Sequence, residues 1–360
     1  MTAVAVSTAT VAGRTQAAPA VRRVGDESAA DWNAFVASAA EASLYHRYEW
    51  RRVVQRVFGR ETHYLAAYDG ARMTGVLPLV RLNSRLFGNF LVSLPYVNYG
   101  GALFESPEAA RLLVDHARDL GVELGVSHIE LRHRSNAFES LPVRTDKVAM
   151  LLPMPPTSEL LWKSVGSKVR AQIKQGRRAG AECVRGAAEL LDDFYAVFAE
   201  NMRDLGTPVY PRRFFQQILE AFPVATNILV VRLNGQPVAA GFLMGDGRTL
   251  EIPWASSLRR ANRYSVNMLL YWHALEFACE QKYAAFDFGR CTVDSGTYAF
   301  KKQWGAQPAQ LYWHYWMRGG GEPPRLNHSN PKFGAAVALW RRLPLFVANR
   351  LGPMLIGNLP

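Results

Sequence analysis

Two stretches of the chain alternate apolar and polar residues on both sides of a tight turn. The first, residues 62–80, turns at an Asp-Gly pair (69–70), and the second, residues 228–244, turns at an Asn-Gly pair (234–235). Such pairs between alternating apolar segments are strong hairpin signals. The sequence therefore predicts two β-hairpins, whose turns lie 165 residues apart.

The elements around each hairpin also match. Third strands are predicted at 90–97 and 249–256, and each is followed by a helix and a further strand. The helices lie at about 107–124 and 265–281, and the strands after them at 128–131 and 285–288. Helices also precede the hairpins, at 29–40 and 48–57 in the first half and at 158–180 and 188–205 in the second. The predicted fold class is α/β, of the α+β kind, with two tandem units that each have a mixed sheet flanked by helices.

This order of helices, three antiparallel strands, a helix and a strand resembles the GNAT acyltransferase fold. We expect a first GNAT-like domain at residues 20–150 and a second at residues 151–318. Other α+β domains can produce the same order by chance. Residues 1–19 are expected to be a disordered leader, and residues 319–360 a linker followed by a C-terminal amphipathic helix.

Length and composition indicate the number of domains and the redox environment of the protein. With 360 residues, 49% of them hydrophobic and 20% charged, the chain is long enough for two globular domains. The cysteines Cys183, Cys279 and Cys291 show no Cys-x-x-Cys spacing, which predicts neither a disulfide framework nor a zinc site. No apolar run is long enough to span a bilayer. A reducing cytoplasm fits these features best.

The charge is strongly positive and predicts an acidic partner. The net charge is +12 and the pI is about 9.8, which suits nucleic acid, an anionic bilayer or a phosphorylated substrate. Residues 163–180 hold six lysines and arginines and no acidic residue. Val165, Val169 and Ile173 recur every four residues and should face the core, leaving the basic side chains outward for phosphates. A solvated charged face is the alternative.

A strand end rich in charge lies late in the chain. Asp287 stands in a Phe-Asp-Phe-Gly-Arg run that ends with Arg290, and a Lys-Lys pair, Lys301 and Lys302, follows. Loops at strand ends often carry the chemistry of α/β folds, and lysines are rare here, eight of 42 basic residues. Alternatively, Asp287 only caps a turn and the lysines are solvated.

Two other segments are candidate binding sites. Arg203 and Asp204 end a predicted helix, where the arginine suits a phosphate or carboxylate, or instead pairs with its neighbour or a helix C-terminus. Tyr96, Asn98 and Tyr99 precede a glycine pair and suit sugar or amide recognition, or a buried strand end with satisfied hydroxyls.

Several enzyme classes lack their minimum motifs in this sequence. Gly-x-Ser-x-Gly, His-Glu-x-x-His and the Walker A loop are absent, and the Asp-Phe-Gly triplet is not preceded by the other protein-kinase motifs. The eight histidines show no spacing that requires a metal. The sequence therefore predicts no metal.

Taken together, these motifs resemble the FemAB/FemX family of acyl- and aminoacyltransferases, over roughly residues 30–318. The basic segment 163–180, the Arg-Asp pair 203–204, the Asp-Phe-Gly strand end and a Phe-Lys pair (300–301) recur there in this order. The segments 96–101 and 301–306 are most similar to the FemAB-related protein of exosortase/PEP-CTERM systems.

The resemblance implies a function and a set of roles. It implies acyl transfer to an amine or hydroxyl of a cell-envelope or exopolysaccharide precursor, with Lys301 and Arg203 on the diphosphate or other anionic groups of a sugar- or lipid-linked substrate. Glu251 and Asp287, at predicted strand positions, are the candidate bases. Because Glu130, near the counterpart of Asp287 in the first half, has no Lys-Lys pair after it, one site is expected mainly on the second half.

One departure from the GNAT pattern concerns the acyl donor. The usual pyrophosphate loop has glycines between the third strand and its helix, but residues 259–264 contain none. Backbone amides there would not approach the pyrophosphate of an acyl-CoA closely. The donor is therefore open between acyl-CoA and aminoacyl-tRNA, whose acceptor end the arginines of this segment could bind.

The sequence is compatible with three functions. The first is the acyltransferase just described, and the second is a FemX-like peptidyltransferase that depends on aminoacyl-tRNA. The third is a non-catalytic binder of an anionic glycan or lipid-linked precursor. The expected location is cytoplasmic, and the apolar and basic segment 333–359 raises peripheral contact with the inner membrane as a further expectation.

Overall fold

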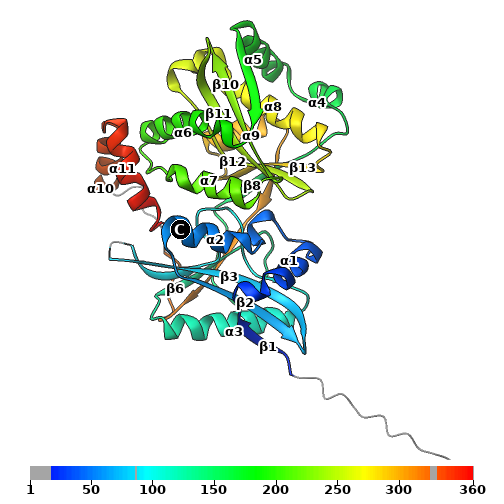
Figure 1. The fold of residues 1–360 in the computed structure, drawn as a ribbon, viewed down its shortest axis with the longest axis vertical. Helices are drawn as coiled ribbons and strands as arrows, with labels where there is room; N and C mark the ends of the chain where they lie inside the picture. The colour runs from blue at the N-terminus through cyan, green and yellow to red at the C-terminus, as the bar shows by residue number, and fades with distance from the viewer. Residues whose placement is uncertain (1–17, 86, 325–330, 360) are drawn as a thin grey trace, which may run out of the picture.

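The computed structural model describes residues 18–85, 87–324 and 331–359. These residues form two twisted sheets, one above the other in Figure 1, with helices packed against both. Each predicted hairpin is present and antiparallel: Asp69 pairs with Arg72, and Leu233 pairs with Gln236. The predicted α/β class with two mixed, helix-flanked sheets is confirmed.

The first sheet has eight strands among the described residues. Its order is β1 (Ala20–Arg23), β2 (Thr62–Asp69), β3 (Arg72–Ser84), β4 (Gly88–Val92), β6 (His128–His133), β15 (Tyr312–Met317) and β7 (Val143–Arg144), with β5 (Leu103–Phe104) on β3. Its helices are α1 (Ala29–Ser38), α2 (Glu49–Phe58) and α3 (Pro107–Glu123). The helix α3 begins at a proline, after Ser106 caps it by accepting from the Ala109 amide.

The second sheet has seven strands in the described chain. Its order is β14 (Gln307–Gln310), β8 (Val148–Pro153), β13 (Ala285–Cys291), β12 (Thr249–Ser257), β11 (Gln236–Gly245), β10 (Thr226–Leu233) and β9 (Ala181–Gly186). Its helices are α4 (Ser158–Ser164), α5 (Ser167–Arg178), α6 (Leu191–Leu205), α7 (Arg212–Ala221), α8 (Val266–Glu280) and α9 (Gly296–Lys302). In α5, Val169 and Ile173 are buried as predicted, because an apolar residue every four positions forms one face.

Each sheet has a parallel pair of strands at the same place in its order. In the first sheet, β4 pairs with β6, and Val92 lies beside Glu130. In the second sheet, β12 pairs with β13, and Glu251 lies beside Asp287. The matching registers put Glu130 at the position in the first unit that Asp287 has in the second.

The chain crosses between the two sheets twice. The strand β8 lies in the second sheet, between β13 and β14, and β15 returns to the first sheet, between β6 and β7. The two sheets are therefore held together by exchanged strands as well as by packing. The domain limits 20–150 and 151–318 stay a prediction.

A shared aromatic core joins the two halves. Trp50 of α2 lies 5.6 Å from the Phe222 ring and 6.3 Å from the Phe214 ring of α7, measured between centroids. Trp254 of β12 packs edge-on against Phe214 and Phe215 in the same cluster. Burial of such large rings makes this junction a continuous core.

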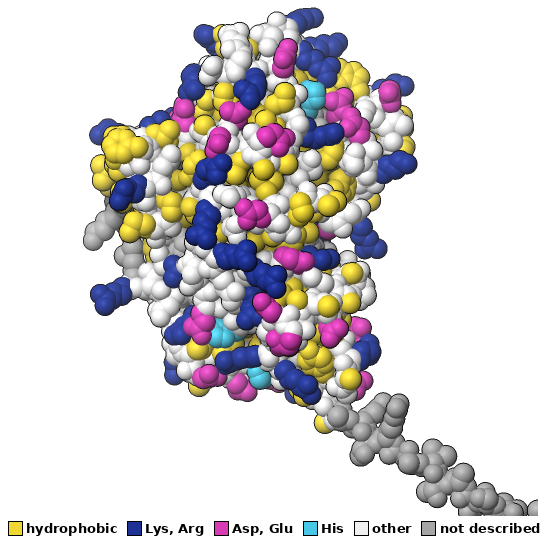
Figure 2. Space-filling model, in the orientation of Figure 1, with side chains coloured by type: hydrophobic (Ala, Val, Ile, Leu, Met, Phe, Trp, Pro, Cys, Tyr) yellow, Lys and Arg dark blue, Asp and Glu magenta, His cyan; other side chains and the backbone are white. Residues whose placement is uncertain are grey.

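The C-terminal residues form two helices that lie beside α6 in Figure 1. They are α10 (Pro331–Trp340) and α11 (Leu345–Ile356), and α11 packs so closely on residue 209 that a Cβ on Gly352 would lie 2.7 Å from the Val209 nitrogen. Figure 2 shows apolar side chains gathered over these helices; Leu339, Phe346 and Met354 are 67 to 76% exposed. Contact of this surface with a membrane stays a prediction.

Among the described helices, none is long and apolar enough to cross a membrane. The leader predicted at 1–19 lies almost wholly outside the described residues. Part of the predicted linker, 325–330, also lies outside them.

Candidate active site

The parallel pair of β12 and β13 carries two buried carboxyl groups side by side. Glu251 and Asp287 are register partners, and their pair is the last one between these strands. Both strands run on, to Ser257 and Cys291, without pairing to each other again. The carboxyl groups therefore lie where the strands part, and their exposed fractions are 7% and 0%.

Glu251 is held by two side chains of the first half. The Tyr45 hydroxyl donates to Oε2 at 2.7 Å, and the Asn98 amide donates to Oε1 at 2.7 Å. Tyr45 lies in a short 3₁₀ helix (Leu44–His46) that precedes α2, and Asn98 lies in the loop after β4. The second half thus supplies the carboxyl group, and the first half fixes its orientation.

Asp287 has three partners of its own. The Tyr99 hydroxyl donates to Oδ2 at 2.5 Å, the Gly289 amide donates to Oδ1 at 2.7 Å, and the Arg134 guanidinium lies 3.9 Å from Oδ2. The same guanidinium lies 4.4 Å from the centre of the Tyr99 ring. Asp287 therefore has the hydrogen bonds and the positive charge that favour its ionised form.

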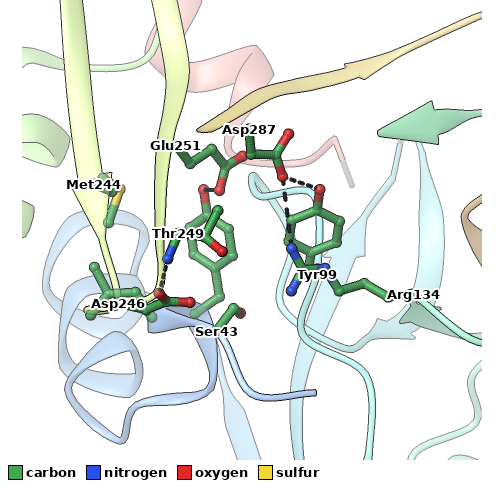
Figure 3. Close-up of a pocket in the computed structure, with 10 residues that line it drawn as sticks. Ser43, Tyr99, Arg134, Met244, Asp246, Thr249, Glu251 and Asp287 are labelled. Atoms are coloured by element: carbon green, nitrogen blue, oxygen red, sulfur yellow. Dashed lines mark hydrogen bonds and ion pairs between the residues drawn. The ribbon is translucent and has the colours of Figure 1, made fainter. Parts of the chain in front are cut away.

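A small pocket, with a volume of about 20 Å³ and partly open to solvent, lies against this pair. Figure 3 shows the two carboxyl groups at one side, Tyr99 and Arg134 at another, and Asp246 and Thr249 near the end of β11 and the start of β12. Its other lining residues are Ser43, Leu44, Tyr45 and Met244. The pocket thus joins one face of the second sheet to loops of the first half.

Both carboxyl groups of the pair have raised pKa values. Burial, followed by repulsion from Asp287, raises the pKa of Glu251 to about 8. Burial also raises the pKa of Asp287, although Tyr99 and Arg134 oppose the rise. Two carboxylates this close cannot both ionise readily in a buried site. Near neutral pH we therefore expect one shared negative charge, favoured on Asp287 because its partners prefer the anion.

Lys301 fixes the strand end rather than facing the pocket. Its side chain is buried, and Nζ donates to the carbonyl oxygens of Gly289 and Arg290 at 2.8 and 2.9 Å. Gly289 has a φ of +75°, which favours glycine. Burial lowers the pKa of Lys301. This lysine therefore stabilises the turn whose amide binds Asp287.

The basic helix α5 covers the segment between β12 and the N-terminus of α8. The Gln175 side chain of α5 donates to the Arg263 carbonyl and accepts from the Ser265 hydroxyl, both at 2.9 Å. A Cβ on Gly176 would lie 3.4 Å from the Tyr264 carbonyl oxygen. Residues 259–264 form a short 3₁₀ helix that leads into α8. Residues of α5 thus already contact the backbone of this segment, at the place where the usual GNAT pyrophosphate-binding loop would lie.

The structure brings some of the predicted site residues together. Glu251 meets Asn98, and Asp287 meets Tyr99, although 153 and 188 residues separate the members of these two contacts in the sequence. Lys302 is exposed on α9, with Nζ 5.8 Å from the centre of the Tyr298 ring, and is not among the pocket's lining residues.

Three other predicted residues lie elsewhere. Arg203 donates to Asp204 at 2.7 Å and to the Leu343 carbonyl at 3.3 Å, so the pair ties the end of α6 to the C-terminal region. The Tyr96 hydroxyl donates to the Gly357 carbonyl at 2.9 Å. None of the three lines the carboxyl pocket, and their role in substrate binding stays a prediction.

Sequence reasoning missed two first-half members of this site. Tyr45 lies in the short 3₁₀ helix Leu44–His46, and in the sequence only its place between two predicted helices distinguishes it. Arg134 directly follows β6, the first-half counterpart of β13, and this repeat position was the one available signal. Among the described residues, no group of three or more His, Cys, Asp or Glu could hold a metal.

Comparisons with known proteins agree with this architecture. Residues 164–302 match the family described as acetyltransferase (GNAT) domain. Among solved structures, the chain is similar to FemX, with a TM-score of 0.63, 14% identity, and coverage of 81% of this chain and 96% of that chain. No curated protein matched.

Two further solved structures are similar over most of their length. The first is the C-terminal domain of a putative lysylphosphatidylglycerol synthetase from Agrobacterium fabrum, with a TM-score of 0.55, 14% identity, and coverage of 87% and 95% of this chain and that chain. The second is a tandem GNAT protein from the clavulanic acid biosynthesis pathway, with a TM-score of 0.52, 14% identity, and coverage of 85% and 100%. The chain thus has a tandem GNAT-like fold.

Proposed function

We propose that this protein is an acyltransferase that moves an acyl or aminoacyl group to an amine or hydroxyl of a cell-envelope or exopolysaccharide precursor. One observation carries the proposal: a buried carboxyl pair lies beside a pocket, where the parallel strands of a GNAT-like unit part. The matched GNAT family and the similar transferase folds support acyl transfer as the reaction type. The link to exosortase/PEP-CTERM systems rests on the motif resemblance alone.

Glu251 is the proposed general base. In acyl transfer the nucleophile forms a bond to the donor carbonyl carbon, the bond to the leaving group breaks, and the nucleophile loses a proton. A carboxylate whose pKa lies near the working pH accepts this proton well. Asp287 keeps a negative charge beside it, which makes Glu251 more basic. The proton then passes to the leaving thiol or hydroxyl, so that the overall transfer is balanced.

The pH dependence of turnover tests this role. Since only the ionised form of Glu251 accepts a proton, and its pKa is raised to about 8, kcat/KM should rise with pH between about 6 and 8 and then level off. Asp287→Asn removes the neighbouring charge and should move the rise to lower pH. A profile that is flat from pH 6 to 9, with no shift in the variant, would rule out this assignment.

A donor other than free acyl-CoA is the second candidate, and the covered start of α8 favours it. The description of the matched family suits an acyl-CoA-type donor. However, α5 occupies the surface beside residues 259–264, and it presents exposed Lys168, Lys174, Arg177 and Arg178 nearby. A row of exposed cations suits the phosphates of an aminoacyl-tRNA.

Salt dependence distinguishes the two donors. If tRNA is the donor, its dissociation constant should rise steeply with salt, and Lys174→Gln with Arg177→Gln should weaken binding and flatten the salt slope by about 2. Arg111→Gln with Arg118→Gln, on α3 of the other half, is the matched control. Tight, salt-insensitive binding of acyl-CoA, measured by calorimetry and unchanged in the α5 variant, would instead favour the acyl-CoA donor.

A further inference from the structure

A β-bulge puts a basic side chain on the same face of the sheet as the carboxyl pair. The register steps from Asp287↔Leu151 to Arg290↔Ala149, so β13 uses three residues where β8 uses two. Gly289, with its positive φ, lies within this step. Since side chains alternate along a strand, the extra residue returns Arg290 to the face of Asp287. The two positions are about 7 Å apart along the strand.

Among the described residues, the Arg290 guanidinium makes no hydrogen bond and no ion pair, and the carboxylates of Glu130 and Asp146 act on it only at longer range. Its side chain is exposed and packs against the Trp313 ring, 5.0 Å from the centroid. Arg132 differs, because it is buried and donates to Glu130 and to the Val97 carbonyl, both at 2.7 Å. A guanidinium has five N–H donors, and those of Arg290 are free for a ligand.

A second guanidinium adds positive charge at the same place. Arg132 lies 4.5 Å from the centre of the same Trp313 ring. Of the carboxylates that act on Arg290, Glu130 pairs with Arg132, and Asp146 pairs with Arg144 and Lys147, so positive charge is in excess around Arg290. Both arginines also oppose the rise that burial causes in the pKa of Tyr210. Desolvation by the surrounding protein, followed by repulsion from Arg132, lowers the pKa of Arg290 to about 10. The guanidinium therefore stays charged at neutral pH.

We propose that Arg290, with Arg132 behind it and the Trp313 indole as its wall, binds a carboxylate or phosphate group of the acyl acceptor. A guanidinium binds either group through two parallel hydrogen bonds, and an anion here would relieve the repulsion between the two arginines. The inference rests on the proposed function, which puts the acceptor nucleophile beside Glu251. The acceptor would then carry its negative charge about 7 to 10 Å from the nucleophilic atom.

Anion binding without any donor tests this site directly. The probes are inorganic phosphate, diphosphate and succinate at constant ionic strength, with thermal shift and mass-spectrometric mapping of phenylglyoxal modification as readouts. We expect at least one probe to raise the Tm and to protect Arg290 from modification. Arg290→Gln should lose the shift, and Arg290→Lys should keep part of it. Phosphate protection without succinate protection identifies the ligand group as phosphate, and the reverse result identifies a carboxylate.

The matched control is Arg22→Gln, since Arg22 is also exposed and lies 5.2 Å from the centre of a ring, that of Tyr68. This variant should keep the full shift. The inference is overturned if no probe protects Arg290, or if Arg290→Gln responds to the probes as the wild type does. Because these readouts need no turnover, a failure of Glu251 as base would leave them unaffected.

Steady-state kinetics of the Arg290 variant provide a second test of this site. With an anionic acceptor, Arg290→Gln should raise KM about 10- to 100-fold, the usual effect of losing a hydrogen-bonded charge, with a much smaller change in kcat. A neutral analogue of the acceptor should show no such difference between wild type and variant. Equal losses with both acceptors would contradict a role in binding the anion.

Discussion

Glu251→Gln is expected to lower kcat/KM by about 10²- to 10⁴-fold, the range that a positioned general base contributes. Glutamine can keep the hydrogen bonds, because its oxygen accepts from Asn98 and its amide donates to the Tyr45 hydroxyl, but it cannot take a proton. A steady-state assay with the identified donor measures the loss. Glu276→Gln, which changes a half-buried glutamate beside His273 on α8, is the matched control and should keep full activity.

The same variant should be more stable than the wild type at high pH. The folded pKa of Glu251 lies above its unfolded value, so the folded state holds the proton more tightly. The contribution of Glu251 to stability is therefore fully present below the unfolded pKa and is lost as the pH rises through the folded pKa near 8. Since glutamine does not titrate, the gain in Tm should grow from pH 5 to pH 9. A variant that is inactive and also less stable at pH 9 would indicate a structural role only.

Arg132→Met is expected to lower the free energy of unfolding by about 3 to 5 kcal/mol, the usual cost of leaving a buried charge unpaired. Glu130 is 4% exposed and Arg132 is 1% exposed. Burial alone would raise the pKa of Glu130, but Arg132 and the Tyr315 hydroxyl hold it below its usual value. Without Arg132, the Glu130 carboxylate keeps the hydrogen bond from Tyr315 and the more distant charge of Arg290, and its buried negative charge loses its ion-pair partner. Urea unfolding measures the change.

The double variant Glu130→Gln with Arg132→Met separates charge from packing. Glutamine keeps a hydrogen bond to the Tyr315 hydroxyl and carries no charge, so it should recover most of the lost stability. If the single and double variants are equally unstable, the loss comes from packing of Arg132 on Trp313. A single-variant loss below about 1 kcal/mol would contradict the buried-pair argument.

Much of the fold could be predicted from the sequence because its signals are local. The Asn-Gly pair predicts the β10/β11 hairpin, and Asn234 and Gly235 do take the positive φ angles, 52° and 77°, that such a turn requires. Strand 249–256 and helix 265–281 agree with β12 and α8 within one residue at each end. These elements depend on neighbours in the chain, so the pattern of nearby residues determines them.

The candidate site was predictable only in part. Glu251 and Asp287 could be found because each is a carboxylate at a predicted strand position of the second unit. The partners Tyr45 and Arg134 could not be found in this way, since their contacts span 206 and about 150 residues. The charge of Lys301 is evident from its residue type, but its environment, a buried turn rather than an open pocket, depends on the tertiary structure.

Local sequence patterns thus specify the repeated order of elements, the basic helix and the two acidic strand positions. The return of β15 to the first sheet, the contacts of Arg203 with Asp204 and the C-terminal region, and the bulge that aligns Arg290 with Asp287 arise only in the folded chain. The difference lies in the range of the interactions. Alternation and turn chemistry act between neighbours, whereas the pairing of distant strands and the burial of a charge depend on the whole packed chain.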